Sequence, residues 1–217
     1  MQLNAFLQAL DDLLQPAKFN DYCPNGLQVE GRAEVRTLVT GVTASEALID
    51  AAIALKADAI LVHHGYFWKG ERAEIIGMKR RRIGKLISHD LSLLAYHLPL
   101  DAHPTLGNNA QLAQRLGFAR ESSLFPQDPR AVGDVGTLVP AMTADALSQR
   151  IEEVLGRKPL HIAGSDKLIQ RVAWCTGGAQ GFIEQAIAMG VDAYFSGEIS
   201  EPTVHAARES GVHYWAM

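Results

Sequence analysis

The sequence lacks several features that would assign it to a specialised class of protein. It has only two cysteines, Cys23 and Cys175, which are far apart and form no CxxC pair, so a disulfide scaffold is excluded and a reducing compartment is favoured. No apolar run approaches the roughly 20 residues that span a bilayer. Residues 1–6 have neither the basic segment nor the apolar core of a signal peptide. We therefore expect a cytoplasmic protein with no membrane partner.

The chain also lacks an excess of positive charge and the common nucleotide-binding and nucleophile motifs. Its 217 residues include 20 basic and 24 acidic side chains, a net charge of −4 that does not favour a nucleic-acid-binding surface. No P-loop, GxGxxG or GxSxG motif is present. Hydrophobic residues make up 47% of the chain, which is long enough for one to two domains with a substantial core.

Hydrophobic periodicity and turn residues predict alternating helices and strands. A strand over 35–41, a helix capped by Thr43 or Ser45 and a buried strand over 58–63 form a strand–helix–strand unit, which implies a parallel pair. Residues 119–135 are polar and contain Pro and Gly, which marks a boundary or an insertion. The other predicted elements are helices over 2–15, 79–90, 110–116 (capped by Asn108-Asn109) and 143–155 (capped by Thr143), and a strand over 91–97.

The second half of the chain repeats part of the first. A shift of 134 positions aligns residues 46–67 with 180–201 at six identities in 22 positions, including Asp58 on Asp192. Convergence of two similar units is the alternative, but the ungapped match favours duplication. We predict one α/β repeat over residues 1–125 and a second over 126–217. The repeat also leads us to expect a further C-terminal segment beyond Met217.

Polar side chains follow two neighbouring predicted strands. His63 and His64 close one strand, and the next ends in His97-x₃-Asp101. Ligands of α/β sheets gather at the carboxyl ends of strands. Imidazoles and a carboxylate suit zinc, manganese or iron, and a carboxylate can bridge two ions about 3.5–4 Å apart. Partly buried histidines bonded to backbone are the alternative, but the second polar strand end leads us to favour a metal site.

Other candidate residues keep more than one interpretation at this point. Glu198 lies at the strand end that the repeat equates with His64, where it accepts a proton, binds a metal-bound water or caps the helix that starts near Pro202. Trp68 and Phe67 either line a pocket or pack in the core. A structural or solvated role is predicted for the remaining histidines, which are His89, His103, His161, His205 and His213.

Four motifs follow one another in a specific order. They are Leu61-Val62-His63-His64-Gly65, His97-Leu98-Pro99-Leu100-Asp101-Ala102-His103-Pro104 with Gly107-Asn108-Asn109, Cys175-Thr176-Gly177-Gly178, and Ser196-Gly197-Glu198. Together they resemble the GTP cyclohydrolase I type 2-like family, also called NIF-three-like, and its bacterial YbgI group above all. The resemblance covers nearly the whole chain, including residues 21–31.

The resemblance implies a specific fold, assembly and metal site. The fold would consist of two intertwined α/β repeats with mixed sheets, assembled into a toroidal homohexamer. His63, His64 and Asp101 would hold two divalent ions, with Asp101 as the bridge and His97 as a further ligand or a residue that contacts one. The family's remaining ligands, a His and a Glu, would come from a motif that begins just past Met217.

The residues and the resemblance together favour a dinuclear metal-dependent hydrolase of a nucleotide-like small molecule. The ions would activate a water, and for a purine substrate the attack would open or cleave a C–N bond. His97 and Glu198 are the candidates for moving protons. A role in handling damaged nucleotides is part of what the resemblance implies. The alternative is a non-enzymatic, ring-shaped metal-binding protein with a regulatory or DNA-repair role.

Overall fold

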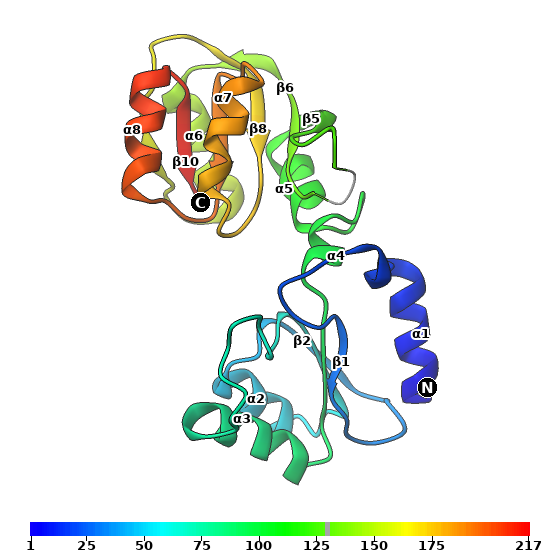
Figure 1. Cartoon of the computed structure of the whole chain (residues 1–217). Helices are drawn as coiled ribbons and strands as arrows, with labels where there is room; N and C mark the ends of the chain where they lie inside the picture. The colour runs from blue at the N-terminus through cyan, green and yellow to red at the C-terminus, as the bar shows by residue number, and fades with distance from the viewer. Residues whose placement is uncertain (129–130) are drawn as a thin grey trace. The chain divides into compact units, whose positions relative to one another are not determined.

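The computed structural model describes residues 1–128 and 131–217, and this part of the chain forms two compact units (Figure 1). The first unit comprises Met1–Leu100 and the second Asp101–Met217. Each contains one mixed β-sheet with helices on both faces, so the predicted α/β class with mixed sheets is confirmed. Among the described residues, no helix combines the length and apolar character needed to cross a bilayer.

The first unit has a four-stranded sheet in the order β1-β4-β3-β2. Strands β2, β3 and β4 are parallel, as the strand–helix–strand pattern predicts, and β1 is antiparallel to β4. The elements in chain order are α1 (Leu3–Leu14), η1 (Pro16–Lys18), β1 (Gly26–Val29), β2 (Leu38–Thr43), α2 (Glu46–Ala54), β3 (Ala59–His64), α3 (Gly77–Ser88), β4 (Ser92–Ala95) and α4 (Leu98–Asp101).

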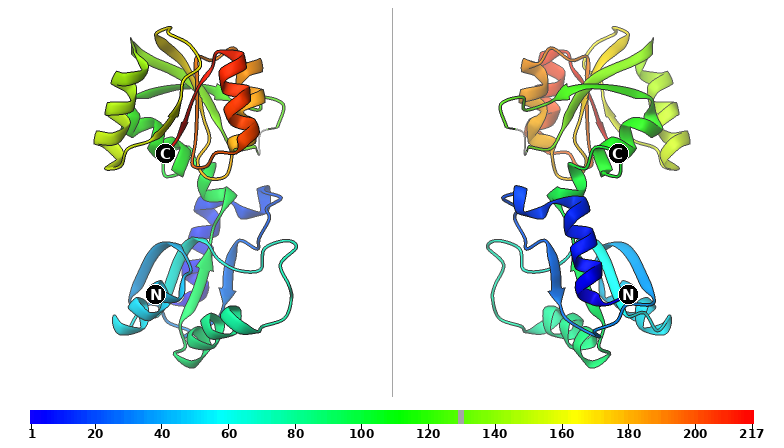
Figure 2. Two further views of the ribbon diagram at one scale, coloured as in Figure 1. Left: turned by 90° about the vertical axis from the view of Figure 1, so that its left-hand side faces the viewer. Right: turned by 90° about the vertical axis from the view of Figure 1, so that its right-hand side faces the viewer.

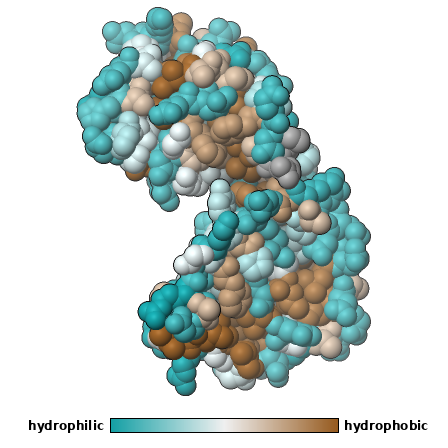
Figure 3. Space-filling model, in the orientation of Figure 1, coloured by the Kyte–Doolittle hydropathy of each residue, from teal (hydrophilic) through white to brown (hydrophobic). Residues whose placement is uncertain are grey.

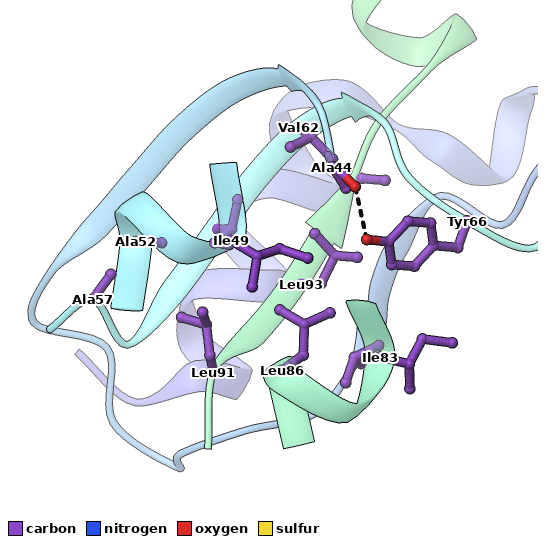
Figure 4. Close-up of a cluster of buried hydrophobic side chains, with 13 residues drawn as sticks. Ala44, Ile49, Ala52, Ala57, Val62, Tyr66, Ile83, Leu86, Leu91 and Leu93 are labelled. Carbon is purple, nitrogen blue, oxygen red and sulfur yellow. Dashed lines mark hydrogen bonds between the residues drawn. The ribbon is translucent and has the colours of Figure 1, made fainter. Parts of the chain in front are cut away.

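The main core of this unit lies between the sheet and helices α2 and α3 (Figure 4). Ile49, Leu86 and Leu93 are fully buried there, and each such side chain contributes about 1.5–3 kcal/mol through removal of apolar surface from water. Of the two predicted caps of α2, Ser45 is the one used, since its hydroxyl accepts a hydrogen bond from Leu48 N at 3.2 Å. Helix α1 covers the opposite face of the sheet, where Leu3 packs in a smaller cluster.

The second unit has a six-stranded sheet in the order β5-β6-β8-β9-β10-β7. Figure 2 shows α6 on one face of this sheet and α7 and α8 on the other. The predicted cap Thr143 is confirmed, because its hydroxyl accepts from Ala146 N at 3.3 Å. The elements are α5 (Asn108–Leu116), β5 (Phe118–Ser123), β6 (Asp134–Met142), α6 (Ala144–Leu155), β7 (Leu160–Ile162), β8 (Ile169–Trp174), η2 (Gln180–Phe182), α7 (Ile183–Ala188), β9 (Ala193–Ser196), α8 (Glu201–Ser210) and β10 (His213–Ala216).

The two sheets repeat one topology. Strands β1-β4-β3-β2 of the first unit correspond in order and direction to β7-β10-β9-β8 of the second, with one antiparallel and two parallel pairings in each set. Helices also correspond along the chain, since α1, α2 and α3 match α6, α7 and α8. Strands β5 and β6 extend only the second sheet. The arrangement agrees with the duplication predicted from the 134-residue shift.

A carboxylate at the same place in both repeats ties two parallel strands together. Asp58 Oδ2 accepts hydrogen bonds from the backbone N–H groups of residues 36 and 37, both at 2.9 Å. Asp192 Oδ2 accepts from residues 170 and 171, at 3.0 and 2.8 Å. These partners are again 134 positions apart. The shared Asp is therefore explained by its task, which is to satisfy the N–H groups at the start of a neighbouring strand.

The structure differs from the sequence prediction around residues 100–135. The compact units divide between Leu100 and Asp101, because α5 and β5 pack in the core of the second sheet. The predicted repeat boundary at 125/126 itself stays a prediction. Residues 119–135, predicted as a boundary or an insertion, contain most of β5 and the start of β6, while residues 129–130 lie outside the described residues.

The predicted capping of the helix at 110–116 by Asn108-Asn109 is wrong. Gly107 precedes α5, and both asparagines lie inside its first turn. Their side chains bind elsewhere, because Asn108 donates to the Asp101 carboxylate and Asn109 bonds to backbone groups of Asp101 and Thr176.

Replacing Asp58 by Ala should lower the free energy of unfolding by about 1.5–3 kcal/mol, because two backbone donors lose a charged acceptor. The N–H groups of Thr37 and Arg36 lower the pKa of Asp58 below its ordinary value of 3.8. A lowered folded-state pKa stabilises the protein above the unfolded pKa, and the stabilisation is lost as the pH falls through the folded one. The difference between wild type and variant, measured by urea unfolding, should therefore shrink below pH 3.8.

Asp12→Ala is the matched control for this substitution. Asp12 lies exposed on α1, where it accepts one hydrogen bond from Gln8 Nε2 at 2.8 Å. Its loss should change the free energy of unfolding by less than about 0.5 kcal/mol. Equal effects at Asp58 and Asp12 would contradict the proposed task of the shared carboxylate.

Candidate metal centre

Three histidines predicted as ligands lie together at the ends of two neighbouring strands of the first unit. His63 and His64 are the last residues of β3, and His97 follows β4. The ring centroids of His63 lie 4.4 Å from His64 and 5.0 Å from His97, and those of His64 and His97 are 5.6 Å apart. One ligand atom from each of the three residues lies within 4.8 Å of the others. The structure thus brings this part of the predicted site together.

A tight turn follows the two histidines and leaves no room for a side chain at Gly65. A Cβ there would lie 2.1 Å from Gln28 Oε1 and 2.7 Å from the Ala95 Cβ. Gln28 occupies this space because it holds the turn, accepting from Tyr66 N at 2.7 Å and donating to Tyr66 O at 3.1 Å. Any larger residue at Gly65 would collide with the Gln28 side chain and with Ala95 of β4, so the bonds that hold this turn would have to change.

The chain then reverses at Phe67 and brings Trp68 against the cluster. Phe67 has a φ of 64°, a conformation that is strained for a bulky residue. Its ring packs against the core and under Lys79 Nζ, 5.1 Å from the ring centroid. The Trp68 ring lies edge-on to His97 and His64, with centroids at 5.0 and 5.8 Å. Of the two interpretations left open, Phe67 therefore packs in the core and Trp68 borders the histidines.

Asp21 is a functional candidate that the sequence analysis did not single out. Its carboxylate bonds to His97 Nδ1 at 2.7 Å and accepts from Asn25 Nδ2 at 2.9 Å and from the N–H of Leu98 at 2.9 Å. A fourth bond comes from Tyr22 N at 2.6 Å. Burial alone would raise the pKa of Asp21, but these four donors together lower it to about 2. Asp21 is therefore a carboxylate at neutral pH.

The Asp21 carboxylate fixes the orientation of the His97 ring. A carboxylate can only accept, so His97 Nδ1 carries the proton and Nε2 carries the lone pair in the neutral ring. Asn25 Oδ1 also accepts from His97 N at 2.8 Å, which holds the backbone in place. Histidines that bind metals in proteins commonly have such a carboxylate on the other ring nitrogen. The only sequence signal for Asp21 was its place in residues 21–31, a stretch that belongs to the family resemblance.

Asp21, Cys23 and His97 form a second group with ligand atoms within 4.8 Å of one another. Cys23 is buried. The Asp21 oxygens already accept four hydrogen bonds, so ligation by Asp21 would leave some of those donors without an acceptor. For this reason the three imidazoles form the better metal centre, and Asp21 contributes to it by orienting the His97 ring.

Asp101 belongs to the second unit, where it ends α4 four residues after His97 along the chain. It is 8% exposed, and its Oδ1 accepts from Asn108 Nδ2 at 2.8 Å. Asn109 Nδ2 donates to its backbone oxygen at 3.4 Å, and Asn109 Oδ1 accepts from Thr176 N at 2.8 Å. The first turn of α5 thus positions Asp101, whose membership of the metal site stays a prediction.

Glu198 also lies in the second unit, just after β9. Its carboxylate atoms lie 3.6 Å from the place of a Cβ on Gly178, so a side chain there would touch it. Within the described part of the chain, no backbone N–H of α8 donates to this carboxylate, so the capping interpretation finds no support. The proton-transfer role of Glu198 stays a prediction.

The other histidines have structural contacts. His161 Nε2 and His213 Nδ1 are 3.0 Å apart, so one ring donates a hydrogen bond to the other, and burial lowers the pKa of both rings. His205 pairs with Glu201 at 3.0 Å on α8. His103 Nδ1 accepts from backbone N–H groups of the turn that follows it.

The fold and the site define a class of protein. It has two mixed sheets of the same topology, and a cluster of histidines at the ends of two parallel strands in the first. The sequence profile of the Duf34/NIF3 (NGG1p interacting factor 3) family matches residues 1–217. The chain belongs to this family, which confirms the resemblance drawn from its motifs.

Individual relatives agree with the family assignment. Proteins named GTP cyclohydrolase 1 type 2 homolog are 54% identical in Pseudomonas aeruginosa, over 99% of this chain and 84% of the relative, and 57% identical in Vibrio cholerae, over 100% and 85%. A solved structure of protein ybgI, described as of unknown function, has a TM-score of 0.94 at 50% identity. The match covers 100% of this chain and 86% of the ybgI chain. A solved structure from Thermus thermophilus has a TM-score of 0.88 at 30% identity, over 99% and 85%.

We expect Asp21→Asn to release the His97 ring. The Nδ1-protonated tautomer should give way to a mixture, because a neutral amide is a weaker acceptor and also presents donors to the ring. Two-bond ¹H–¹⁵N correlation spectra of the histidine rings measure the tautomer directly. The affinity for divalent metal, measured by competition with a chromophoric chelator, should fall about 10- to 100-fold.

Asp50→Asn serves as the control in the same unit. Asp50 lies exposed on α2, and its carboxylate pairs with Lys85, which is not part of the histidine cluster. It should leave both the His97 spectrum and the metal affinity unchanged. An Asp21→Asn protein that behaves like this control would refute the positioning role of Asp21.

Proposed function

We propose that this protein is a metal-dependent hydrolase that acts on a nucleotide-like small molecule. The observation that carries the proposal is the group of His63, His64 and His97, with ligand atoms within 4.8 Å of one another. The name GTP cyclohydrolase 1 type 2 homolog, given to relatives 54% and 57% identical to this chain, supports a purine nucleotide as the class of substrate. A damaged purine nucleotide belongs to the same class of substrate.

The donor set suits divalent transition metals. Neutral imidazole nitrogens bind zinc, iron and manganese, and the Asp21 carboxylate behind His97 is the partner that such ligands commonly have. Three imidazoles bring no negative charge, so a carboxylate ligand is needed to balance two divalent ions. We assign this task to Asp101, as the bridge. A carboxylate offers about four acceptor positions, so the bond from Asn108 is compatible with ligation.

Bound divalent ions would supply Lewis acidity and lower the pKa of a coordinated water toward neutrality. The protein's own residues would hold the substrate and move protons. Hydrolysis of a purine ring adds water across a C–N bond, so one group must accept a proton from the attacking water and the leaving nitrogen must receive one. The Glu198 carboxylate is one candidate acceptor. The second candidate acceptor is His97 Nε2. It can take this role only if His97 contacts a metal ligand and does not itself bind the metal.

We also propose that the chain assembles as a toroidal homohexamer in the cytoplasm. Figure 3 shows apolar side chains gathered on the surface of the first unit. Ile75, Ile76 and Met78, close together along the chain, are 50%, 58% and 54% exposed, and burying them against another copy would be favourable. Cys23 and Cys175 are free thiols, as expected in a reducing compartment. A monomer in sedimentation equilibrium would contradict the assembly.

Purified protein should bind zinc, manganese or iron, and His64→Ala and Asp101→Ala should each lower the affinity more than tenfold, because each removes a ligand. Elemental analysis after equilibration with each metal gives the content per chain. His89→Ala is the matched control, since His89 is an exposed histidine of the same unit with its ring bonded to Lys85 O at 2.9 Å. Unchanged metal content in both site variants would show the assignment to be wrong.

Trp68 gives an optical readout of the same binding. Its ring lies 5.0 Å from that of His97, whereas Trp174 and Trp215 are fully buried in the second unit. Co²⁺ should quench the emission of Trp68 with the stoichiometry found by elemental analysis. In Trp68→Phe the quenching should disappear while the metal content stays the same. Stoichiometric binding without quenching would place the ion away from the histidine cluster.

Turnover should require both the metal and the histidine cluster. A screen of purine nucleotides and their oxidised or ring-damaged analogues, followed by ultraviolet absorbance and mass spectrometry, should find a substrate that gains one water. Removal of the metal, or His64→Ala, should slow the reaction at least about 100-fold. Tight metal-dependent binding of nucleotides with no turnover of any would contradict hydrolysis and favour the non-enzymatic role.

A further inference from the structure

The second unit contains a small cavity beside Asp101. It has a volume of about 100 Å³ and lies between the turn after α4, the first turn of α5, strand β5 and the start of β6. The polar residues that line it are Asp101, His103, Asn109, Arg120, Ser123 and Asp134. A pocket for a whole small-molecule ligand usually measures about 300–1,000 Å³, whereas a single water needs only about 10–15 Å³ of such space. The cavity is therefore large enough for one chemical group of a ligand.

Arg120 is held in this cavity by one of its three nitrogens. Its Nε donates to Asp134 Oδ1 at 2.6 Å, and the Arg120 side chain is 54% exposed whereas that of Asp134 is 11% exposed. Within the described part of the chain, the two terminal nitrogens of Arg120 donate to no other residue. A guanidinium anchored through Nε keeps its terminal N–H groups available as a fork, which matches two oxygens of a phosphate or carboxylate.

Two further donors line the same wall. His103 Nδ1 accepts from the N–H groups of Thr105 at 3.3 Å and Leu106 at 3.0 Å, so the proton of the neutral ring is on Nε2. The Ser123 hydroxyl oxygen accepts from Phe125 N at 3.0 Å, so its own proton remains to be donated. A guanidinium fork, an imidazole N–H and a hydroxyl together form a set of donors suited to an oxyanion.

Two carboxylates also line the cavity. Asp134 pairs with Arg120, and Asp101 is the residue to which the proposed function assigns a metal. A cation held by Asp101 would attract an anion beside it, so an anion should bind in the cavity more tightly when the metal is present.

We propose that this cavity binds a phosphoryl group of the substrate, with Arg120 as the residue that selects a phosphorylated ligand. The inference rests on the proposed function, because it places the phosphate beside the metal ligand Asp101. It adds to that function the place at which the phosphate of a nucleotide binds and the residue that distinguishes a nucleotide from a free base or nucleoside. Asp134 positions Arg120, and His103 and Ser123 donate to the remaining phosphate oxygens.

The test is calorimetric titration of the full, metal-loaded chain with guanosine, GMP, GTP and inorganic pyrophosphate. Wild type should bind the nucleotides at least tenfold more tightly than guanosine. Arg120→Gln should remove this preference, weakening nucleotide binding about 10- to 100-fold while guanosine binding stays within twofold. Arg120→Lys should lie between the two, because a lysine restores the charge without the fork. Arg157→Gln, an exposed arginine of the same unit, is the matched control.

Metal content and the unfolding midpoint, measured on every variant, separate the two proposals. Arg120→Gln with normal metal content and normal stability, but no phosphate preference, is the expected result. Equal affinity of wild type for guanosine and GMP, or unchanged nucleotide affinity in Arg120→Gln, would overturn the phosphoryl site and leave the metal-dependent hydrolase standing. Binding of pyrophosphate alone, unaffected by Arg120→Gln, would also overturn it, since it would reveal a free-phosphate site elsewhere. Metal content that is insensitive to His64→Ala would overturn the proposed function instead.

Discussion

The histidine cluster depends on one buried carboxylate. Two bonds of Asp21, to the His97 ring and to Leu98 N, join a loop near the start of the chain to the end of β4, 76 and 77 residues later. A buried charge costs free energy unless donors surround it, and here four donors do so. Two histidines of the cluster therefore end a central strand, β3, whereas the orientation of the third depends on the Asp21 carboxylate.

The sequence predicts the parts of this arrangement that have a local signal. The parallel strands follow from an apolar run with a short helical crossover, and the pair His63-His64 is contiguous with its strand, so both could be predicted. The contact of Asp21 with His97 has no periodicity and no motif, which is why only the structure finds it. Strand β5 was missed because it is an edge strand, and the charged Arg120 and Glu121 that suit an edge also suit a loop.

The strained turn after β3 illustrates how a local cost is compensated by packing. Phe67 adopts a backbone conformation that an aromatic residue rarely takes, at a cost of about 1–3 kcal/mol. Its ring is packed against the same core as Ile49 and Leu86, and that burial offsets a cost of this size. The result is that Trp68 lies against His64 and His97, which makes the surroundings of the cluster more apolar. Fewer waters beside the histidines would strengthen their interaction with any bound cation.

In both repeats, the two ends of the parallel strands have different tasks, because one end stabilises the sheet and the other carries the candidate functional residues. At the amino ends of the parallel strands, Asp58 and Asp192 bind backbone N–H groups in the same way, so both repeats have the same structural task at this position. At the carboxyl ends, the aligned positions differ, with His63-His64 in one repeat and Gly197-Glu198 in the other. Carboxyl ends of strands can change because loops there carry little of the sheet's stability. The two sheets thus share the bonds made at the start of their parallel strands, while the residues at the other end of these strands differ.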